Sequence, residues 1–319
     1  MPTYVVLNPA SGQGAGLRRW RRVEPLARRV WPDLDLVTAD SAAALEAAVR
    51  RLAREGPATT LIAAGGDGTS HLVVNGLLDA GGIATPARMA WLPIGSGNDM
   101  ARSIGVPLRG DGRIETYRHA TDSAVDAGRI EYHDPAGRPA GRWFGNSFTV
   151  GISSDVLRIV TRSGKHLGGR ISYFLATLRA LAAQRPRDYD LTIDGAALPL
   201  DACRLLSVTN GPSFGAGMRI APNADLTDGR FDFLAATRLS TAGTAALFPR
   251  IYWGGHLSHP AITARRITRL LLGGTGPIAF EADGELYEAC LPVAVEVVAG
   301  GLPIRRPAPE SPKRLHFRG

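Results

Sequence analysis

The stretch from Leu61 to Thr69 constrains the fold most strongly, because an apolar run ends there in a glycine-rich turn. An amphipathic segment follows from Ser70 to Leu77, so the order predicts a buried strand, a tight turn and a helix start. Glycines let the backbone approach a bulky anion closely, and the free N–H groups of a helix N-terminus suit phosphate. Asp67 would repel a bare phosphate, which predicts a Mg²⁺ ion between the two. The turn therefore predicts a nucleotide site with Mg²⁺.

Two further glycine-rich turns follow apolar strands. The strand 4–7 leads into the turn 8–16, and the strand 89–94 leads into the turn 95–102. Strands alternating with helices predict an α/β domain with a mostly parallel sheet. Ligands bind beyond the carboxyl ends of such strands, so the three turns are expected to converge on one ligand. None of them matches the P-loop or the dinucleotide-binding pattern.

The chain changes character after about residue 120, where short apolar strands separated by turns dominate and one amphipathic helix is expected at 171–183. This density of strands predicts a β-rich, sandwich-like C-terminal domain. A chain of 319 residues is also long for one core. We predict a nucleotide-binding domain at 1–122, a β-rich domain at 123–302 whose last strand could return to the first domain, and a basic, mobile tail at 303–319.

The charge balance of 37 − 29 = +8 and a pI near 10.1 favour an anionic partner, although a solvated basic face would give the same balance. No nucleic-acid motif occurs, so the expected anionic partner is a membrane surface or a nucleotide and not a nucleic acid. No apolar run spans a bilayer, no secretory signal opens the chain, and Cys203 and Cys290 lack metal or redox spacing. The expected location is cytoplasmic, with peripheral membrane association.

Four ordered motifs together resemble one family. They are Asn8-Pro9 with Ser11-Gly12, Gly65-Gly66-Asp67-Gly68-Thr69 with Asn75-Gly76, Gly95-Ser96-Gly97-Asn98-Asp99, and Asp283-Gly284-Glu285. Their order and spacing resemble the diacylglycerol kinase catalytic family, especially the bacterial lipid kinases related to sphingosine kinases. The resemblance covers most of the chain. It implies a nucleotide site between an α/β domain and a β-sandwich, and Mg²⁺-dependent transfer of the ATP γ-phosphate to the hydroxyl of a membrane lipid such as diacylglycerol.

The resemblance also implies roles for individual residues. The nucleotide would contact Asn8, Ser11, Gly12, Thr38, Gly65, Gly66, Asp67, Gly68, Thr69, Ser96, Gly97 and Asn98. Catalytic Mg²⁺ would be held by the carboxylates of Asp67, Asp99 and Asp126 through direct or water-mediated contacts. Asp283 resembles the catalytic base, with Glu285 as a second candidate, and Lys165 matches a lysine near the transferred phosphate. A structural metal loop would take a carboxylate from Asp228 and backbone carbonyls near Asp225 and Arg230, although a solvated loop is an equal alternative.

The chain departs from the family pattern at His71-Leu72, where Asn-Glu is usual, and at Ser96, where Thr is usual. We expect His71 to be a helix-face residue without chemistry. Two alternatives stay open: a NAD kinase, whose family shares the Gly-Gly-Asp-Gly turn, and a nucleotide-binding regulator without catalysis. The identity of the acceptor and the oligomeric state, including a homodimer, stay open as well. Asp-Gly is a favoured hairpin pair, so Asp194-Gly195 is expected to be an ordinary turn.

Overall fold

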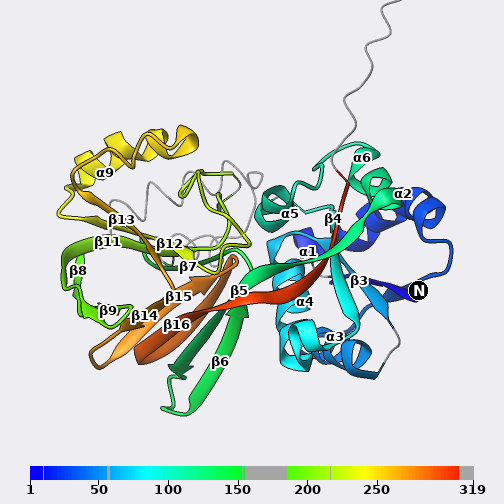
Figure 1. Ribbon diagram of the computed structural model, residues 1–319, viewed down its shortest axis with the longest axis horizontal. Coiled ribbons are helices and arrows are strands. Elements are labelled where there is room, and N and C mark those ends of the chain that lie inside the picture. Colours follow the sequence, from blue (N-terminus) through cyan, green and yellow to red (C-terminus); the bar gives the residue numbers. More distant parts are fainter. Residues whose placement is uncertain are drawn as a thin grey trace, which may run out of the picture.

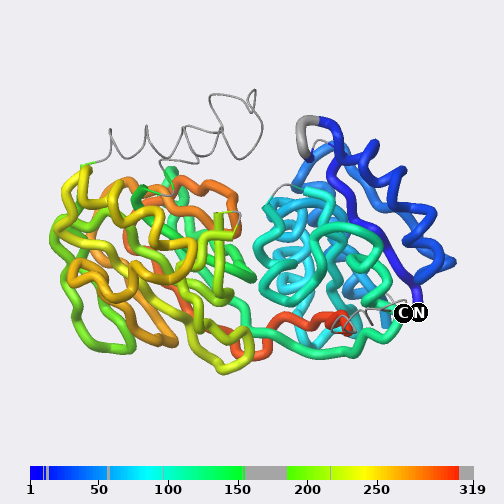
Figure 2. Tube along the Cα trace, turned by 90° about the horizontal axis from the view of Figure 1, so that it is seen from above, coloured from blue at the N-terminus to red at the C-terminus, as the bar shows by residue number. Residues whose placement is uncertain are grey.

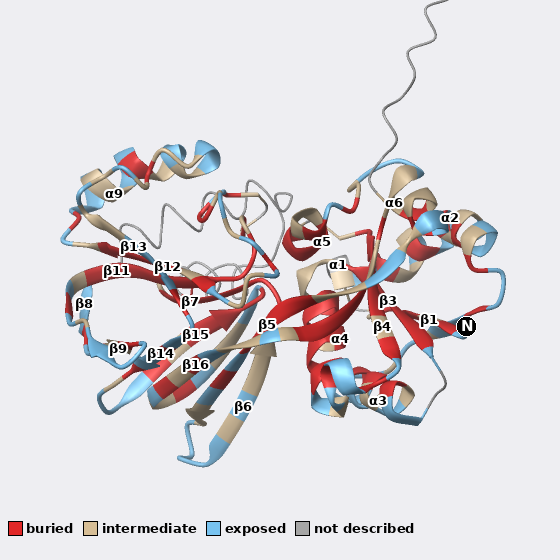
Figure 3. Cartoon of the chain, in the orientation of Figure 1, coloured by how far each residue is buried: buried red, intermediate tan, exposed pale blue. Residues whose placement is uncertain are grey.

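The computed structural model describes residues 1–9, 11–55, 58–95, 97–152, 154, 185–215 and 217–308. Two lobes lie side by side (Figure 1). The first lobe contains a parallel sheet in the order β4-β3-β1-β2. Its strands are β1 (Thr3–Val6), β2 (Leu34–Val37), β3 (Thr59–Gly65) and β4 (Ala87–Pro93). Every residue of β3 is buried, as is typical of a parallel strand covered on both faces (Figure 3).

Helices connect these strands in the predicted rhythm. They are α1 (Ser11–Gly14), α2 (Gly16–Val30), α3 (Ala42–Glu55), α4 (Asp67–Ala80), η1 (Gly82–Ala84), α5 (Asp99–Ile104), α6 (Gly112–Glu115) and η2 (Thr116–His119). Ser41 caps α3 as its position predicts, because its Oγ accepts a hydrogen bond from the Ala44 N–H at 3.2 Å. None of the helices in the described part of the chain combines the length and apolar character needed to cross a bilayer.

The second lobe is built from antiparallel strands around its own aromatic core. Its elements are β6 (Pro139–Phe144), β7 (Ser147–Gly151), β8 (Arg187–Tyr189), β9 (Leu191–Ile193), β10 (Ala196–Ala197), β11 (Leu200–Thr209), β12 (Phe231–Thr237), α9 (Thr241–Leu247), η3 (Phe248–Trp253), β13 (Ile262–Ile267), β14 (Arg269–Leu272) and β15 (Pro277–Ala282). The predicted fold class, an α/β domain followed by a β-rich domain, is confirmed. The helix expected at 171–183 lies outside the described residues.

Two long strands, β5 (Thr121–His133) and β16 (Glu285–Arg306), pair antiparallel and run through both lobes (Figures 1 and 2). The far end of β16 lies parallel to β4, with Ile304 opposite Met89. Residues 303–306 are therefore strand and not the start of a tail, and Ile304 is fully buried. The proline and arginines of this segment suggested a tail from composition, whereas its pairing with β5 and the burial of residues 301–304 determine its structure.

Candidate active site

The turns after β3 and β4 pack directly on one another. A side chain at Gly95 would come within 2.5 Å of the backbone nitrogen of Gly66, so only glycine allows this approach. The Asp99 N–H donates a hydrogen bond to Asp67 Oδ1 at 2.7 Å. Gly97 faces the other carboxylate oxygen of Asp67. The second and third predicted motifs thus form one site at the carboxyl edge of the parallel sheet.

The fourth motif reaches this site from the other lobe. Asp283 and Gly284 form the turn between β15 and β16, with φ values of 50° and 88°, which is the conformation that Asp-Gly favours in two-residue hairpins. A side chain at Gly284 would lie 3.9 Å from Asp67 Cβ, and the Glu285 carboxylate faces Gly68 at the start of α4. Carboxylates from three motifs therefore meet where the two lobes face each other.

The carboxylate of Asp283 is held by backbone groups. The Gly145 N–H donates to Oδ2 at 2.8 Å, and the N–H groups of Asn146 and Ser147 donate to Oδ1 at 2.8 and 3.0 Å. Asp283 is buried, and its own N–H donates to the carbonyl of Ser147. Hydrogen bonds from N–H groups to a carboxylate are strong because the acceptor is charged. They fix the position and orientation of the side chain.

His71 is a site residue that the sequence interpretation missed. It is buried, with Nδ1 3.3 Å from Asp283 Oδ2 and Nε2 2.6 Å from the Tyr287 hydroxyl. The Asn75 amide also lies 3.2 Å from Nε2, and its oxygen accepts from the Trp143 N–H. With an amide donor and a hydroxyl facing Nε2, the network assigns the proton to Nδ1, which donates to Asp283. Its spacing of four residues from Asp67 was the available signal, because that spacing places both on one helix face.

The clustered carboxylates perturb one another. Burial, and then the charges of Asp99 and Asp283, raise the pKa of Asp67 to about 7. Burial also raises the pKa of Glu281 to about 7, with the charge of Asp283 adding to the shift. Glu281 accepts a hydrogen bond from the Thr149 hydroxyl at 3.0 Å. The sequence interpretation missed Glu281, although one acidic residue inside an apolar strand was a signal. Such a group of acids favours a bound cation.

The N-terminus of α4 offers groups for an anion. Its cap residue, Gly66, supplies no side-chain acceptor, so the first N–H groups of the helix are available to a ligand. Thr69 Oγ1 is buried against Gly65 and has no hydrogen-bond partner among the described residues. The helix start and this hydroxyl suit phosphate oxygens.

The other predicted nucleotide residues lie along the same edge or outside the described part. Asn8 follows β1, its carbonyl accepts from the Ser11 N–H at 3.0 Å, and Ser11 with Gly12 opens α1. Thr38 follows β2 and is exposed. Asn98 has a φ of 61° and donates to the Gly95 carbonyl, which shapes the turn before α5. Ser96 and Lys165 lie outside the described residues.

Both carboxylate oxygens of Asp126 accept backbone hydrogen bonds. Its Oδ1 accepts from the Gly300 N–H and its Oδ2 from the Gly229 N–H, both at 2.7 Å. Asp126 lies where the β5–β16 pairing changes register between Val298 and Leu302. Its carboxylate therefore fastens the irregular part of β16 to the loop before β12.

The predicted structural metal loop also uses its carboxylates internally. Asp225 Oδ1 accepts from the Thr227 N–H and hydroxyl, and Asp228 pairs with Arg266 and accepts from the Arg230 N–H. Within the described ranges, no three Asp, Glu, His or Cys side chains are grouped as a metal site requires. Asp67, Asp99 and Asp126 therefore do not form a direct set of three carboxylate ligands in this part of the chain.

Mg²⁺ nevertheless fits the acidic cluster in a more limited way. It is commonly held by one or two carboxylates together with phosphate oxygens and water. Asp67 and Asp99 are the two that adjoin the glycine turn at the start of α4, where the Asp99 N–H donates to Asp67 Oδ1. Arg102 pairs with Asp99 and offsets part of the negative charge.

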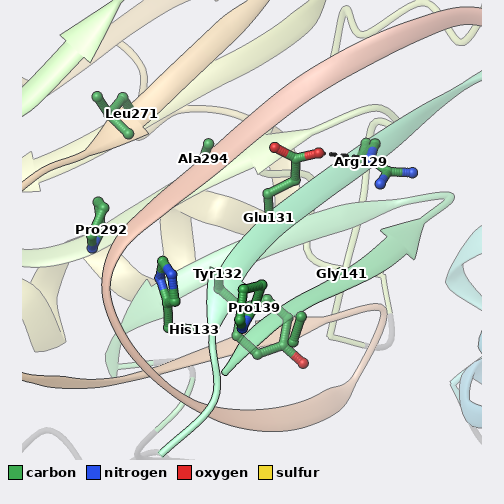
Figure 4. A pocket seen from close by; sticks show the side chains of 10 residues that line it. Arg129, Glu131, Tyr132, His133, Pro139, Gly141, Leu271, Pro292 and Ala294 are labelled. Atoms are coloured by element: carbon green, nitrogen blue, oxygen red, sulfur yellow. Dashed lines mark hydrogen bonds and ion pairs between the residues drawn. The ribbon is translucent and has the colours of Figure 1, made fainter. Parts of the chain in front are cut away.

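A separate pocket of about 510 Å³ lies in the β-rich lobe (Figure 4). Side chains of β5 and β6 line one part of it, and Leu271, Pro292 and Ala294 line another. Tyr132 lines the pocket and its ring lies 6.4 Å from that of Tyr287, the partner of His71. None of the predicted site residues lines it, so it is distinct from the acidic cluster.

A phosphate-binding turn in an α/β domain, faced by a fixed carboxylate from a β-sandwich, defines a two-domain phosphotransferase. Comparison with known families agrees: residues 2–130 match the diacylglycerol kinase catalytic domain, and residues 146–306 match the YegS C-terminal NAD kinase beta sandwich-like domain. The chain belongs to the diacylglycerol kinase family. It is a kinase that transfers phosphate to a hydroxyl group.

Similar proteins include a diacylglycerol kinase of Mycobacterium tuberculosis, 30% identical over 311 residues that cover 94% of this chain and 93% of the relative. A diacylglycerol kinase of Bacillus subtilis is 28% identical, covering 78% of this chain and 76% of its own length. Among solved structures, a diacylglycerol kinase from Bacillus anthracis str. Sterne aligns with a TM-score of 0.67 at 18% identity, covering 96% of both chains. A second structure from that organism reaches a TM-score of 0.76 at 22% identity, covering 96% and 95%. These structures share the fold.

Proposed function

We propose that the chain transfers the γ-phosphate of ATP to the hydroxyl group of diacylglycerol, with Mg²⁺, at an anionic membrane surface. The observation that carries the proposal is the meeting of Asp67, Asp99 and Asp283 beside the open N-terminus of α4. Relatives that cover most of the chain are named diacylglycerol kinases, which supports the choice of acceptor.

The residues of the cluster divide the chemistry between them. Phosphoryl transfer depends mainly on alignment and charge compensation. Backbone N–H groups at the start of α4 would bind phosphate oxygens, and Asp67 with Asp99 would hold Mg²⁺, which compensates charge on the phosphates when bound. The acceptor oxygen forms a bond to the γ-phosphorus, the bond from that phosphorus to the bridging oxygen breaks, and ADP leaves. The hydroxyl proton goes to Asp283.

Asp283 can accept that proton only by exchanging a contact. A carboxylate has about four lone-pair positions, and three backbone N–H groups and His71 already face them. The His71 contact is the longest of the four, at 3.3 Å. We therefore place the incoming hydroxyl at Oδ2, where it competes with His71.

The test is to incubate the purified chain with γ-labelled ATP, Mg²⁺ and dispersed diacylglycerol, and to identify the labelled product. Labelled phosphatidic acid is expected, and Asp283→Asn should lower turnover by roughly 100-fold or more. The matched control is Asp194→Asn, which alters the other Asp-Gly turn, where the carboxylate accepts from Thr268 and Arg269 away from the cluster.

If Asp283→Asn turns over at the wild-type rate, Asp283 is not the group that accepts the hydroxyl proton. The same reaction with NAD in place of lipid separates the main alternative, because labelled NADP without labelled lipid would identify a NAD kinase. Nucleotide binding without transfer to either acceptor would favour the regulator hypothesis.

A further inference from the structure

Two adjacent aromatic side chains are exposed at the end of η3. Tyr252 is 49% and Trp253 is 64% exposed. The other large apolar side chains exposed on the described residues are separate from one another in the sequence: Met1, Leu36, Ile83 and Leu271. An exposed pair of this size is uncommon on a soluble surface and indicates a binding surface.

The segment that carries the pair has a well-packed inner face. Leu247 is buried in a core cluster of the β-rich lobe, and Phe248, Ile251 and Leu257 pack on that cluster. The Phe248 and Tyr252 rings meet edge to face at 6.4 Å. The exposed aromatics therefore belong to the outer face of an ordered amphipathic segment.

The outer face is also free of acidic residues. No Asp or Glu occurs between Leu239 and Ala261. Arg250 is exposed within η3, and the exposed Arg219 adjoins it, because the Arg219 N–H donates to the Ile251 carbonyl at 3.1 Å. We call Arg219, Pro249, Arg250, Tyr252 and Trp253 the η3 surface. Its aromatic and cationic character complements an anionic lipid layer.

One loop joins the η3 surface to the acidic cluster. The loop is the one that follows β11. Near its start, the Ser213 carbonyl accepts a hydrogen bond from the Asn146 side-chain amide, and the Asn146 backbone N–H donates to the Asp283 carboxylate. Further along, a side chain at Gly217 would lie 3.5 Å from the Arg102 guanidinium, the partner of Asp99. The loop then reaches η3 at Arg219. The same loop therefore contacts both the η3 surface and the residues that hold Asp283 and Asp99.

We propose that the η3 surface docks the protein on an anionic phospholipid bilayer, with Tyr252 and Trp253 in the interfacial layer and Arg219 and Arg250 at the phosphates. This inference rests on the proposed function, in which the acceptor is a membrane lipid. A protein partner would leave the absence of acidic residues unexplained, whereas a negative lipid surface selects against them.

The experiment is co-sedimentation of the full chain with vesicles of phosphatidylcholine mixed with phosphatidylglycerol, and with vesicles of phosphatidylcholine alone. The wild type should bind the anionic vesicles preferentially. Trp253→Ser should weaken binding about ten-fold through lost apolar contact. Arg250→Gln should weaken it roughly five-fold, and only for the anionic vesicles. Ile83→Ser is the matched control, because Ile83 is 53% exposed on the other lobe.

Equal binding by the wild type, Trp253→Ser and Ile83→Ser would overturn the inference. It would also fail if Trp253→Ser dissociated a dimer in light scattering while vesicle binding was unchanged, since the surface would then be a protein interface. The proposed function is tested separately with a short-chain, soluble diacylglycerol. Phosphorylation of that acceptor without vesicle binding leaves the function and removes the docking surface, and vesicle binding without phosphorylation does the reverse.

Discussion

Replacing Asp126 by asparagine should destabilise the folded chain strongly. Asp126 is 1% exposed, and each of its oxygens accepts one backbone N–H at 2.7 Å. An asparagine amide has one accepting oxygen, so either orientation turns its NH₂ group toward the N–H of Gly229 or of Gly300. The change loses a charge-assisted hydrogen bond and leaves a half-buried N–H without an acceptor, which together cost about 2–4 kcal/mol.

The assay is urea unfolding followed by intrinsic fluorescence. A loss of that size should lower the unfolding midpoint by on the order of 1 M for a chain of this length. Asp225→Asn is the matched control. It makes the same chemical change in the loop that Asp126 holds, but its carboxylate accepts from Thr227 at the exposed surface, so its effect should stay below about 1 kcal/mol.

The result also separates two roles for Asp126. A metal ligand that is not needed for folding would leave the midpoint unchanged and abolish Mg²⁺-dependent turnover. Asp126→Asn could instead unfold at the same urea concentration as the wild type and the control while turnover is lost. The interpretation that Asp126 stabilises the contact between β5, β16 and the loop before β12 would then be wrong.

Three further predictions concern the cluster. Glu281→Gln should flatten the pH dependence of the free energy of unfolding. The pKa of Glu281 is about 7 in the folded chain and 4.5 in the unfolded chain, so the native state binds more protons between those pH values. Wild-type stability therefore falls as pH rises through this window and is constant above it. Thermal unfolding from pH 4.5 to 8 checks this, and a variant with the wild-type slope would contradict it. His71→Leu should lower kcat with little change in KM for ATP and alter the pH profile of kcat. His71→Asn keeps an N–H donor and should recover part of the rate. Steady-state kinetics across pH measure both variants, and identical losses in the two would indicate that His71 acts through packing alone. Gly97→Ala should weaken ATP binding roughly ten-fold or more in calorimetry, because its Cβ would meet the Asp67 carboxylate, while unchanged affinity would place the nucleotide elsewhere.

Local patterning was enough to predict the α/β domain. The apolar run of β3, the glycine turn and the helix start of α4 lie within about twenty consecutive residues, and each satisfies its backbone with near neighbours or a sheet partner. The packing of the second motif against the third, at the carboxyl ends of β3 and β4, followed from a general rule about parallel sheets. The return of the chain in β16 was less predictable, since Ile304 pairs with a strand more than 200 residues earlier.

Side chains with distant partners were the hardest to interpret from the sequence. Asp126 was predicted as a metal ligand, and the two N–H groups that its carboxylate binds lie 103 and 174 residues away in the sequence. His71 looked inert because its partner, Asp283, is 212 residues away. Neither contact can be recognised from neighbouring residues in the sequence. An aspartate that binds a metal and one that binds two backbone N–H groups can have the same sequence neighbours.

The two Asp-Gly pairs show what decides between a turn and a site. Asp194 and Gly195 have φ values of 49° and 85°, nearly those of Asp283 and Gly284, so the backbone conformation is the same. Asp194 stays at the surface and accepts from Thr268 and Arg269 of its own lobe. Asp283 instead receives three successive N–H groups, from residues 145–147, at the junction with the α4 turn. The chemistry of such a pair is therefore set by which donors the fold brings to the carboxylate, and the turn itself supplies only the direction in which it points.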